Sequence, residues 1–400
     1  MKKNIYNLLW AVIVIFCATS CKSLLEDVPI EQETLDLLFN KNDSAGVDAR
    51  RFLYDTYRSL PAMYNRVGGD FLDAATDDAI SSNTSNTSVQ QLATGTYTSS
   101  GYPDDQWNTY YTAIRQTNIF ITNIDNVPLK GKLANGTPFN HVWKAEAKFL
   151  RAMFYFELVK RYGGVPLIVD KVYQLGDDLN LPRNSFADCV KFISDQCDAI
   201  KDSLLPDPVD PQNIDRPTKA AALALKARVL LYAASPLYNG GNIDGTNELT
   251  GYADFSAERW KQAAEASKAI MNLNVFSLVP SFKDVFITQI NTERIFAKQS
   301  EGDNYNCEND NGPVGYYVGN GRTSPTQEFI DAFGMANGLG IKDIGSGYDS
   351  KNPFVGRDPR FYKTFFYNTA PWLNRTVQTF EGGADKPGGT KQQTITGYYL

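Results

Sequence analysis

The segment that constrains the fold most is a helix predicted over residues 140–162, because its apolar side chains cover more than one face. Charged residues leave only narrow polar stripes along this helix, so it must bury two sides against neighbouring elements. The helix ends at Tyr162-Gly163-Gly164, with Pro166 beyond, and glycine followed by proline is a typical helix stop. A helix buried on two sides predicts an array of packed helices and a mainly α fold.

The neighbouring segments repeat this helical period from about residue 44 to residue 273. Aspartates precede a helix that starts at Trp107, a Ser185 cap opens a second helix, and Ser256 opens a third. A stretch before Ser256, residues 220–234, contains seven alanines, which lets helix backbones approach closely. Antiparallel helices stacked in this way predict a tetratricopeptide-like scaffold over residues 44–276, although no clean repeat of about 34 residues is visible.

From residue 277 onward the helical period weakens, and polar, glycine-rich stretches become frequent. Long loops of this kind occupy residues 79–106, 299–325 and 337–356. Long segments without regular structure inside a folded body are usually functional. The sequence therefore predicts an irregular, loop-rich lobe over residues 277–400, with a few short strands.

The first 21 residues have the layout of a bacterial export signal. A short cationic start precedes an apolar run over residues 8–18, and small residues stand directly before Cys21. The run is shorter than the ~20 residues that a bilayer span needs. The pattern predicts removal of residues 1–20, lipid attachment at Cys21, and a tether over residues 21–43 that holds the folded body at a membrane surface.

The charge balance argues against one class of partner. The chain has 39 Lys and Arg residues against 45 Asp and Glu residues, which gives a formal net charge of -6. No basic stripe is present to displace counterions from phosphates, so no nucleic-acid partner is expected. Hydrophobic residues make up 42% of the chain, which is enough for a sizeable core.

Catalytic and metal-binding motifs are weak in this chain. Its single histidine, His141, leaves no material for His-dependent triads or His-rich metal sites. A glycosidase needs only two carboxylates, but no spacing singles out a pair among the loop acids. Those acids are Asp70, Asp73, Asp77, Asp78, Glu301 and Asp303. Residues 306–312 alternate like a calcium loop but lack its glycine and glutamate positions, so we expect no metal, no cofactor and no enzyme activity.

The motif Arg357-Asp358-Pro359-Arg360 has two interpretations. Its arginines could clamp an anionic ligand, or an arginine and the aspartate could pair internally and fix a turn. The internal pair is the favoured interpretation, because such pairs commonly hold loops in place.

Binding without catalysis would use exposed aromatic rings. Such rings stack on the apolar C–H faces of pyranose sugars, while amides and carboxylates bond the hydroxyl groups. Tryptophans at core spacing on helices, Trp107, Trp143 and Trp260, are expected to pack internally. The candidate ligand contacts are the aromatic residues in predicted loops: Tyr97, Tyr102, Tyr305, Tyr316, Tyr317 and Trp372.

The segment at residues 145–168, which contains the long helix and its Gly-Gly-Val-Pro ending, resembles the RagB/SusD family of outer-membrane nutrient-binding lipoproteins of Bacteroidota. Further similar segments follow in the family's order and spacing along essentially the whole chain. They lie at residues 107–118, 216–233, 260–264, 293–296, 325–333, 357–361 and 396–398. Each segment alone is a weak signal, but together they are highly specific.

The resemblance implies a tetratricopeptide-like helical scaffold that carries an irregular ligand lobe. It implies a protein anchored to the outer membrane through lipid on Cys21, facing the exterior, that captures a glycan or another oligomeric nutrient. It also implies a partner, a SusC-like TonB-dependent barrel that imports the ligand. Family members usually continue beyond the segment at residues 396–398 into more helices, so we expect this chain to end before them.

Two other functions stay open at this point. One is a glycoside hydrolase that uses two loop carboxylates. The other is a protein that only grips the transporter through its helical scaffold, while ligand contact is made elsewhere. Stacking aromatic residues report the faces of sugar rings, and they specify neither the linkage nor the identity of the sugar.

Overall fold

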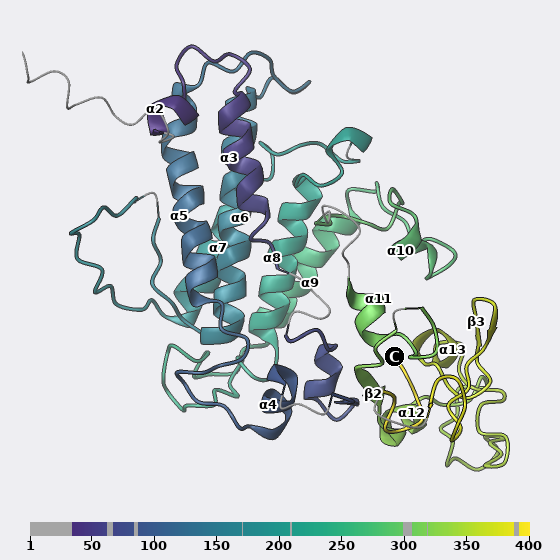
Figure 1. Cartoon of the computed structure of the whole chain (residues 1–400). Coiled ribbons are helices and arrows are strands. Elements are labelled where there is room, and N and C mark those ends of the chain that lie inside the picture. Colours follow the sequence, from purple (N-terminus) through teal and green to yellow (C-terminus); the bar gives the residue numbers. More distant parts are fainter. Residues whose placement is uncertain are drawn as a thin grey trace, which may run out of the picture.

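The computed structural model describes residues 34–61, 67–83, 87–169, 171–208, 210–298, 306–317, 319–387 and 392–400. The predicted signal segment, Cys21 and Tyr305 lie outside these residues. The long helices all lie in the part of the described chain up to residue 271, and short elements joined by loops follow. Figure 1 shows these as two parts side by side, a bundle of long helices and a lobe of short elements. The predicted mainly α fold is confirmed.

The helical scaffold is an array in which each long helix packs against the next one in the sequence. α5 packs on α6, α6 on α7, α7 on α8 and α8 on α9, while α3 lies against α5 and α6. The helices are α2 (Leu35–Leu38), α3 (Val47–Tyr57), α5 (Trp107–Asn123), α6 (Phe139–Tyr162), α7 (Phe186–Ile200), α8 (Lys219–Ala234) and α9 (Ala257–Met271), with 3-10 turns at Ile124–Asn126 and Pro211–Asn213. This nearest-neighbour packing confirms the predicted tetratricopeptide-like arrangement.

Helix α6 lies at the centre of the array and is buried on two sides, as its sequence predicted. Phe149, Ala152 and Leu158 are all fully buried. Gly163 ends the helix with a φ of 71°, and a side chain there would collide with the backbone carbonyl of Leu249. Only glycine combines this backbone angle with so close an approach, which explains why the helix stops here.

A polar network is buried between α5, α6 and α7. Arg151 on α6 is fully buried and donates to Asn118 Oδ1 at 2.7 Å and to Gln196 Oε1 at 2.6 Å. Asn118 in turn donates to the carbonyl oxygen of Ile168 at 3.2 Å. Because buried polar groups must be paired, this network fixes the lateral positions of the three helices.

A buried ion pair ties α6 to the segment before α8. Glu146 is fully buried and accepts hydrogen bonds from two guanidinium nitrogens of Arg216, with Arg216 Nε at 3.2 Å. The Tyr57 hydroxyl on α3 donates to the same carboxylate at 2.9 Å. Burial raises the pKa of Glu146, and the Arg216 guanidinium acts against this shift. The carboxylate therefore depends on Arg216 for its charge balance.

Side-chain caps start the next two helices. Ser185 Oγ accepts a hydrogen bond from the Asp188 amide at the start of α7, as the sequence predicted. Thr218 Oγ1 accepts one from the Ala221 amide at the start of α8. The alanines that follow Thr218 are buried between helices, which confirms the expected close approach of backbones.

The three tryptophans expected in the core have different environments. Trp143 on α6 is only 9% exposed, so that prediction is confirmed. Trp260 is 42% exposed because α9 has its main contacts with α8 alone, and Ala263 is its one fully buried residue. Trp107 is 38% exposed at the start of α5, where it contacts the rings of Tyr111 and Tyr162. The expected internal packing of Trp107 is therefore found in part, in its two ring contacts, and that of Trp260 is wrong.

The remaining elements are short. Three of them precede α5: the 3-10 turn Leu72–Ala75, β1 (Ala79–Ser81) and α4 (Ser88–Thr94). The C-terminal lobe contains α10 (Asp284–Ile287), α11 (Asn306–Asn311), β2 (Thr323–Pro325), α12 (Gln327–Ala332), α13 (Phe361–Thr364), β3 (Pro371–Trp372) and β4 (Arg375–Thr376). Strand β1 pairs antiparallel with β2, and Ser82 Oγ lies 2.6 Å from Ser324 Oγ beside this ladder. This pairing attaches an early part of the chain to the C-terminal lobe.

Arg357 organises the middle of the lobe. This fully buried side chain donates to the carbonyl oxygens of Ile330 at 2.6 Å, Phe333 at 2.7 Å and Pro353 at 2.9 Å. Its guanidinium also lies 4.5 Å from the ring centre of Phe361, within a cluster of packed phenylalanines. Arg357 is thus a structural residue that satisfies loop carbonyls, and it is not available as a ligand clamp.

The other half of that motif is an internal ion pair at the surface. Arg360 bonds Asp358 with an Nη2–Oδ2 distance of 2.6 Å. The Arg360 hydrogen bonds lower the pKa of Asp358 to about 2. The favoured interpretation of the motif, an internal pair that fixes a turn, is confirmed.

No helix in the described residues combines the length and the apolar character needed to cross a membrane.

Candidate functional site

The candidate site lies at the β3–β4 hairpin in the C-terminal lobe, which Figure 1 places at the outer edge of that lobe. Trp372 pairs with Arg375 across the hairpin. The Tyr316 hydroxyl, from the loop after α11, lies 3.1 Å from the carbonyl oxygen of Trp372 and 3.2 Å from that of Arg375. The structure thus brings together two residues that the sequence predicted separately, Tyr316 and Trp372.

The Arg375–Asp385 ion pair supports this arrangement. Arg375 forms a bidentate pair with the fully buried Asp385, with Nη1–Oδ2 and Nη2–Oδ1 distances of 2.6 and 2.8 Å. Its guanidinium carbon lies 3.8 Å from the centre of the Tyr316 ring. Asp385 also accepts hydrogen bonds from the backbone amides of Gly315 at 3.1 Å and Gln378 at 2.7 Å. The guanidinium therefore holds Tyr316 in place by stacking on one face of its ring.

Gly315 is required for this close approach. A side chain at this position would lie within 2.6 Å of Arg375 Nη2 and of Asp385 Oδ1. The loop can therefore lie against the ion pair only because glycine precedes Tyr316.

The electrostatics keep the Tyr316 phenol protonated. Burial raises the pKa of Tyr316, while the Arg375 guanidinium acts in the opposite direction. The pKa of Arg375 is itself raised, chiefly by its hydrogen bonds to Asp385. Tyr316 therefore remains a hydrogen-bond donor to the hairpin at neutral pH.

Exposed aromatic rings lie next to the contacts between Tyr316, Arg375 and Asp385. Tyr317 is 94% exposed, and Trp372 is 42% exposed with one contact to the ring of Phe366, whose centre lies 4.8 Å away. Rings that are held by their own scaffold and still face solvent can stack on the C–H faces of a sugar. The hairpin and the Tyr316 loop therefore offer an aromatic surface to solvent.

Two other predicted aromatic residues form a separate pair. Tyr97 and Tyr102 lie in the loop between α4 and α5, with ring centres 5.7 Å apart and an interplanar angle of 55°. Tyr97 is 44% exposed, so this pair also offers ring surface to solvent. Tyr305, the remaining candidate, lies outside the described residues.

Sequence reasoning missed Arg375 and Asp385. No short motif links them, and each is an ordinary charged residue in a polar loop when considered alone. The available signal was the hairpin itself, because Pro371-Trp372 and Arg375-Thr376 are short strand-like pairs around a tight connection. An arginine at such a hairpin can pair with a carboxylate from a neighbouring loop, but the sequence does not show which carboxylate.

The loop acids proposed for a glycosidase have differing environments. Asp70 is fully buried, accepts from Ser81 Oγ at 3.0 Å and leaves Oδ1 without a partner, and burial raises its pKa. The pKa of Asp78 is also raised, by burial and by the neighbouring charges of Asp77 and Asp73. Glu301 and Asp303 lie outside the described residues. Asp70 is thus a structural carboxylate that holds the Ser81 and Thr87 hydroxyls.

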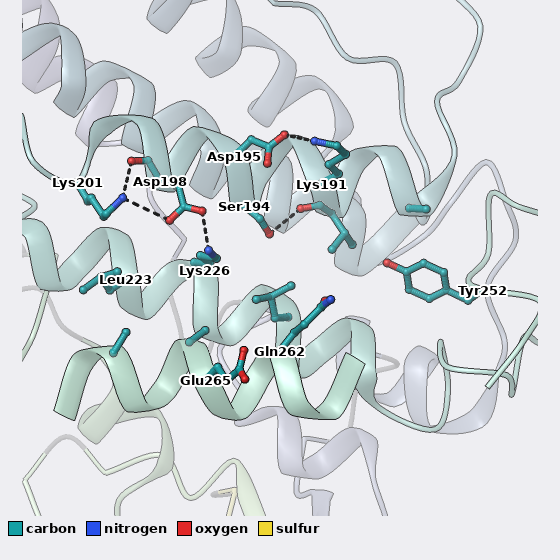
Figure 2. A pocket seen from close by; sticks show the side chains of 15 residues that line it. Lys191, Ser194, Asp195, Asp198, Lys201, Leu223, Lys226, Tyr252, Gln262 and Glu265 are labelled. Atoms are coloured by element: carbon teal, nitrogen blue, oxygen red, sulfur yellow. Dashed lines mark hydrogen bonds and ion pairs between the residues drawn. The ribbon is translucent and has the colours of Figure 1, made fainter. Parts of the chain in front are cut away.

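A groove of about 560 Å³ lies between α7, α8 and α9 in the scaffold. Figure 2 shows that most of its charged side chains are paired with one another, Asp195 with Lys191 and Asp198 with both Lys201 and Lys226, while Glu265 has no partner among the lining residues. Its one aromatic residue, Tyr252, has the Arg259 guanidinium 3.6 Å from its ring centre. The groove therefore offers little free ring surface for a sugar.

Metal ligands do not cluster in the part of the chain that the structure describes. Within those residues, no three His, Cys, Asp or Glu side chains are close enough to hold a metal ion. Residues Asn306–Asn311, in the calcium-like stretch, form helix α11.

Comparison with family models gives two matches along the chain. Residues 37–231 match a model described as "Starch-binding associating with outer membrane", within the SusD-like group. Residues 287–400 match the model of the SusD family. The first match covers most of the helical scaffold, and the second covers the lobe that contains the β3–β4 hairpin.

Individual relatives agree with these matches. SusD-like protein P38 of Formosa agariphila is 26% identical over 58% of this chain and 42% of its own length, so this chain aligns with less than half of that relative. The crystal structure of a SusD-like protein from Bacteroides fragilis superposes with a TM-score of 0.72 at 25% identity, covering 92% of this chain and 70% of that one. A laminarin-binding SusD-like protein gives a TM-score of 0.51 at 19% identity, covering 63% of this chain and 51% of that one. Together with the two family models, these likenesses show that the chain belongs to the RagB/SusD family of SusD-like proteins.

Proposed function

We propose that this protein binds a glycan at the surface of the outer membrane and passes it to a SusC-like TonB-dependent barrel. The observation that carries the proposal is the braced aromatic surface of Tyr316, Tyr317 and Trp372. The Arg375–Asp385 pair fixes the ring of Tyr316, and the rings of Tyr317 and Trp372 stay exposed to solvent. Such a surface suits reversible stacking on sugars.

The division of the chain supports this function. We assign residues 44–276 to the scaffold and residues 277–400 to the ligand lobe, with the β1–β2 ladder joining the two. The family models match these two parts separately, and one model is described as starch-binding. The Tyr97 and Tyr102 pair is a second, smaller aromatic surface that a long glycan could reach.

A glycan array on the purified protein without residues 1–21 tests the binding function. We expect saturable binding of at least one oligosaccharide, with no release of new reducing ends during incubation. Released reducing ends would indicate a glycosidase, and the absence of binding to every glycan of the array would contradict the proposal.

Anchoring at the membrane is part of the proposed function. If Cys21 carries the lipid, Cys21→Ser should leave the fold intact and move the protein from the membrane fraction to the soluble fraction, because acyl chains supply the membrane affinity. Fractionation of cells that lack the partner barrel checks this. Unchanged membrane association of the variant in those cells would contradict lipid anchoring.

A second function, in which the protein only grips the transporter, is favoured by one observation. Apolar side chains are exposed along α8, α9, α10 and the adjoining loops: Leu231, Leu237, Phe255, Trp260, Met271, Phe282, Phe286 and Ile287. Exposed apolar patches of this kind commonly mark protein contacts. Co-purification with the barrel that survives Trp372→Ala, together with no glycan binding by the isolated protein, would support this second function.

A further inference from the structure

Strained backbone is concentrated in the hairpin that carries Trp372. Among the described residues, the non-glycine residues with a positive φ are Asn274, Thr369 and Leu373. Two of these three flank Trp372, with a φ of 74° at Thr369 and of 49° at Leu373. Positive φ angles are unfavourable for leucine and threonine because Cβ crowds the backbone, and such strain persists where the surroundings or a function require it.

Leu373 is the more unusual of the two. It is the first residue of the two-residue connection between Trp372 and Arg375, a position where a positive φ normally selects glycine. Its side chain is 79% exposed, so packing within the protein does little to offset the backbone strain. Leucine is therefore unfavourable here both for the backbone and for solvation, and the isolated protein does not explain its presence.

The hairpin is also held rigidly on both sides of this residue. The Tyr316 hydroxyl lies within hydrogen-bonding distance of the carbonyl oxygens of Trp372 and Arg375, which bracket the connection. Arg375 is in turn fixed by its bidentate pair with Asp385. Leu373 therefore lies on an already ordered hairpin tip, residues 372–375, next to the exposed Trp372. Ligand binding would cost little conformational entropy at this tip.

We propose that Leu373 is a ligand contact, whose aliphatic side chain lies against the C–H face of a pyranose ring beside the ring that stacks on Trp372. The inference rests on the proposed glycan-binding function and adds a residue to its site. Burial of the leucine side chain by the ligand supplies the favourable free energy that the strained tip lacks in the free protein.

Two substitutions at this position separate strain from binding. Leu373→Gly removes the side chain and relieves the backbone, and Leu373→Met keeps an apolar side chain of similar size. Leu175→Gly is the matched control, because Leu175 is a fully exposed leucine in a scaffold loop. Calorimetric titrations would use maltoheptaose, laminarihexaose and a mannan oligosaccharide as probes, with melting temperatures measured for each variant and Trp372→Ala run in parallel.

For the probe that the parent protein binds, we expect Leu373→Gly to weaken binding about 5- to 20-fold. Its Tm should be equal to or above that of the parent, because glycine accepts a positive φ without strain. Leu373→Met should retain binding within about 3-fold, and Leu175→Gly should bind like the parent.

Other outcomes overturn the inference in distinguishable ways. Unchanged binding by Leu373→Gly, while Trp372→Ala binds weakly, would remove Leu373 from the site and leave the proposed function standing. A Tm clearly below the parent's for Leu373→Gly would show that the leucine packs within the lobe. If none of the probes binds the parent, or if Trp372→Ala also binds normally, both the inference and the placement of the site at this hairpin are wrong.

Discussion

The helical scaffold and the C-terminal lobe are held together by different interactions. In the scaffold, long helices bury a continuous apolar core, and its buried polar groups, such as Arg151 and Glu146, serve to fix the positions of helices. In the lobe the elements are short, and the fold depends on two hydrogen-bonded arginines: the buried Arg357 donates to loop carbonyl oxygens, and the partly exposed Arg375 pairs with the buried Asp385. An apolar core tolerates small shifts of its side chains. The loss of one partner of a buried, hydrogen-bonded charge instead leaves that charge unpaired and destabilises the fold. The fold of the lobe is therefore more sensitive to the loss of a single hydrogen-bond partner, and in return its exposed side chains are held in defined positions.

This difference accounts for where the candidate site lies. The ring of Tyr316 and the backbone of the hairpin that carries Trp372 need directional support, which the Arg375–Asp385 pair and the Tyr316 hydroxyl supply. The scaffold instead buries most of its rings in its core, and the charges that line the groove between α7, α8 and α9 are mostly paired with one another. Ligand binding is therefore assigned to the part of the molecule that is held by specific polar contacts.

The largest expected effect concerns the buried Glu146–Arg216 ion pair, which is an exception to the apolar packing of the scaffold. Arg216→Met should destabilise the protein by about 3–5 kcal/mol at pH 7, because Glu146 is left buried without its partner. Urea unfolding followed by circular dichroism measures this. A loss below about 1 kcal/mol would show that the scaffold does not depend on the pair.

The pH dependence of that variant has a definite sign. The pKa of Glu146 is raised in the folded protein, so its stability contribution is present at low pH and is lost as the pH rises through the folded pKa. Removal of Arg216 raises this pKa further. The deficit of Arg216→Met should therefore shrink between pH 7 and pH 5, and a deficit that grows towards pH 5 would contradict the assignment.

The second effect tests whether the lobe depends on Arg357. Arg357→Met should cost about 2–4 kcal/mol in the stability of the lobe, because several buried carbonyl oxygens lose their donor. Hydrogen exchange should show faster exchange around α12 and α13, with the amides of α6 still protected. Equal loss of protection in both regions would mean that scaffold and lobe unfold as one unit, and the comparison would fail.

The third effect tests packing in the scaffold. Ala152→Leu should destabilise the protein by about 1–3 kcal/mol, because this position on α6 is fully buried and has no room for a larger side chain. Ala264→Leu on the exposed surface of α9 is the matched control, and it should change stability by less than about 0.5 kcal/mol. Equal melting temperatures for the Ala152→Leu variant and the parent would contradict two-sided burial of α6.

The sequence predicted the scaffold better than the lobe, for physical reasons. The period of apolar residues and the caps at Ser185 and Gly163 are local signals, and they located α6 and α7 well. Trp260 looked like a core residue because it shares a helical face with alanines, yet α9 has a major helix contact only with α8. Helical spacing shows which residues share a face, but it does not show whether another element covers that face.

The site could be predicted only in part for a similar reason. Loop position and residue type were enough to select Tyr316, Tyr317 and Trp372 as candidates. The contact between Tyr316 and the hairpin, and the Arg375–Asp385 pair beneath it, join residues from separate loops. The β1–β2 ladder joins still more distant parts of the chain. Such long-range pairings leave no periodic signal in a single sequence.

The most direct test of the account compares two tryptophans with the same exposure, Trp372 in the lobe and Trp260 in the scaffold, each 42% exposed. Each would be replaced by alanine, and binding of the best oligosaccharide from the glycan array would be measured by calorimetric titration. The account predicts that Trp372→Ala weakens binding by about 1–3 kcal/mol with stability changed by less than about 1 kcal/mol, while Trp260→Ala binds like the parent. Normal binding by Trp372→Ala together with weakened binding by Trp260→Ala would place ligand recognition in the scaffold and contradict the account.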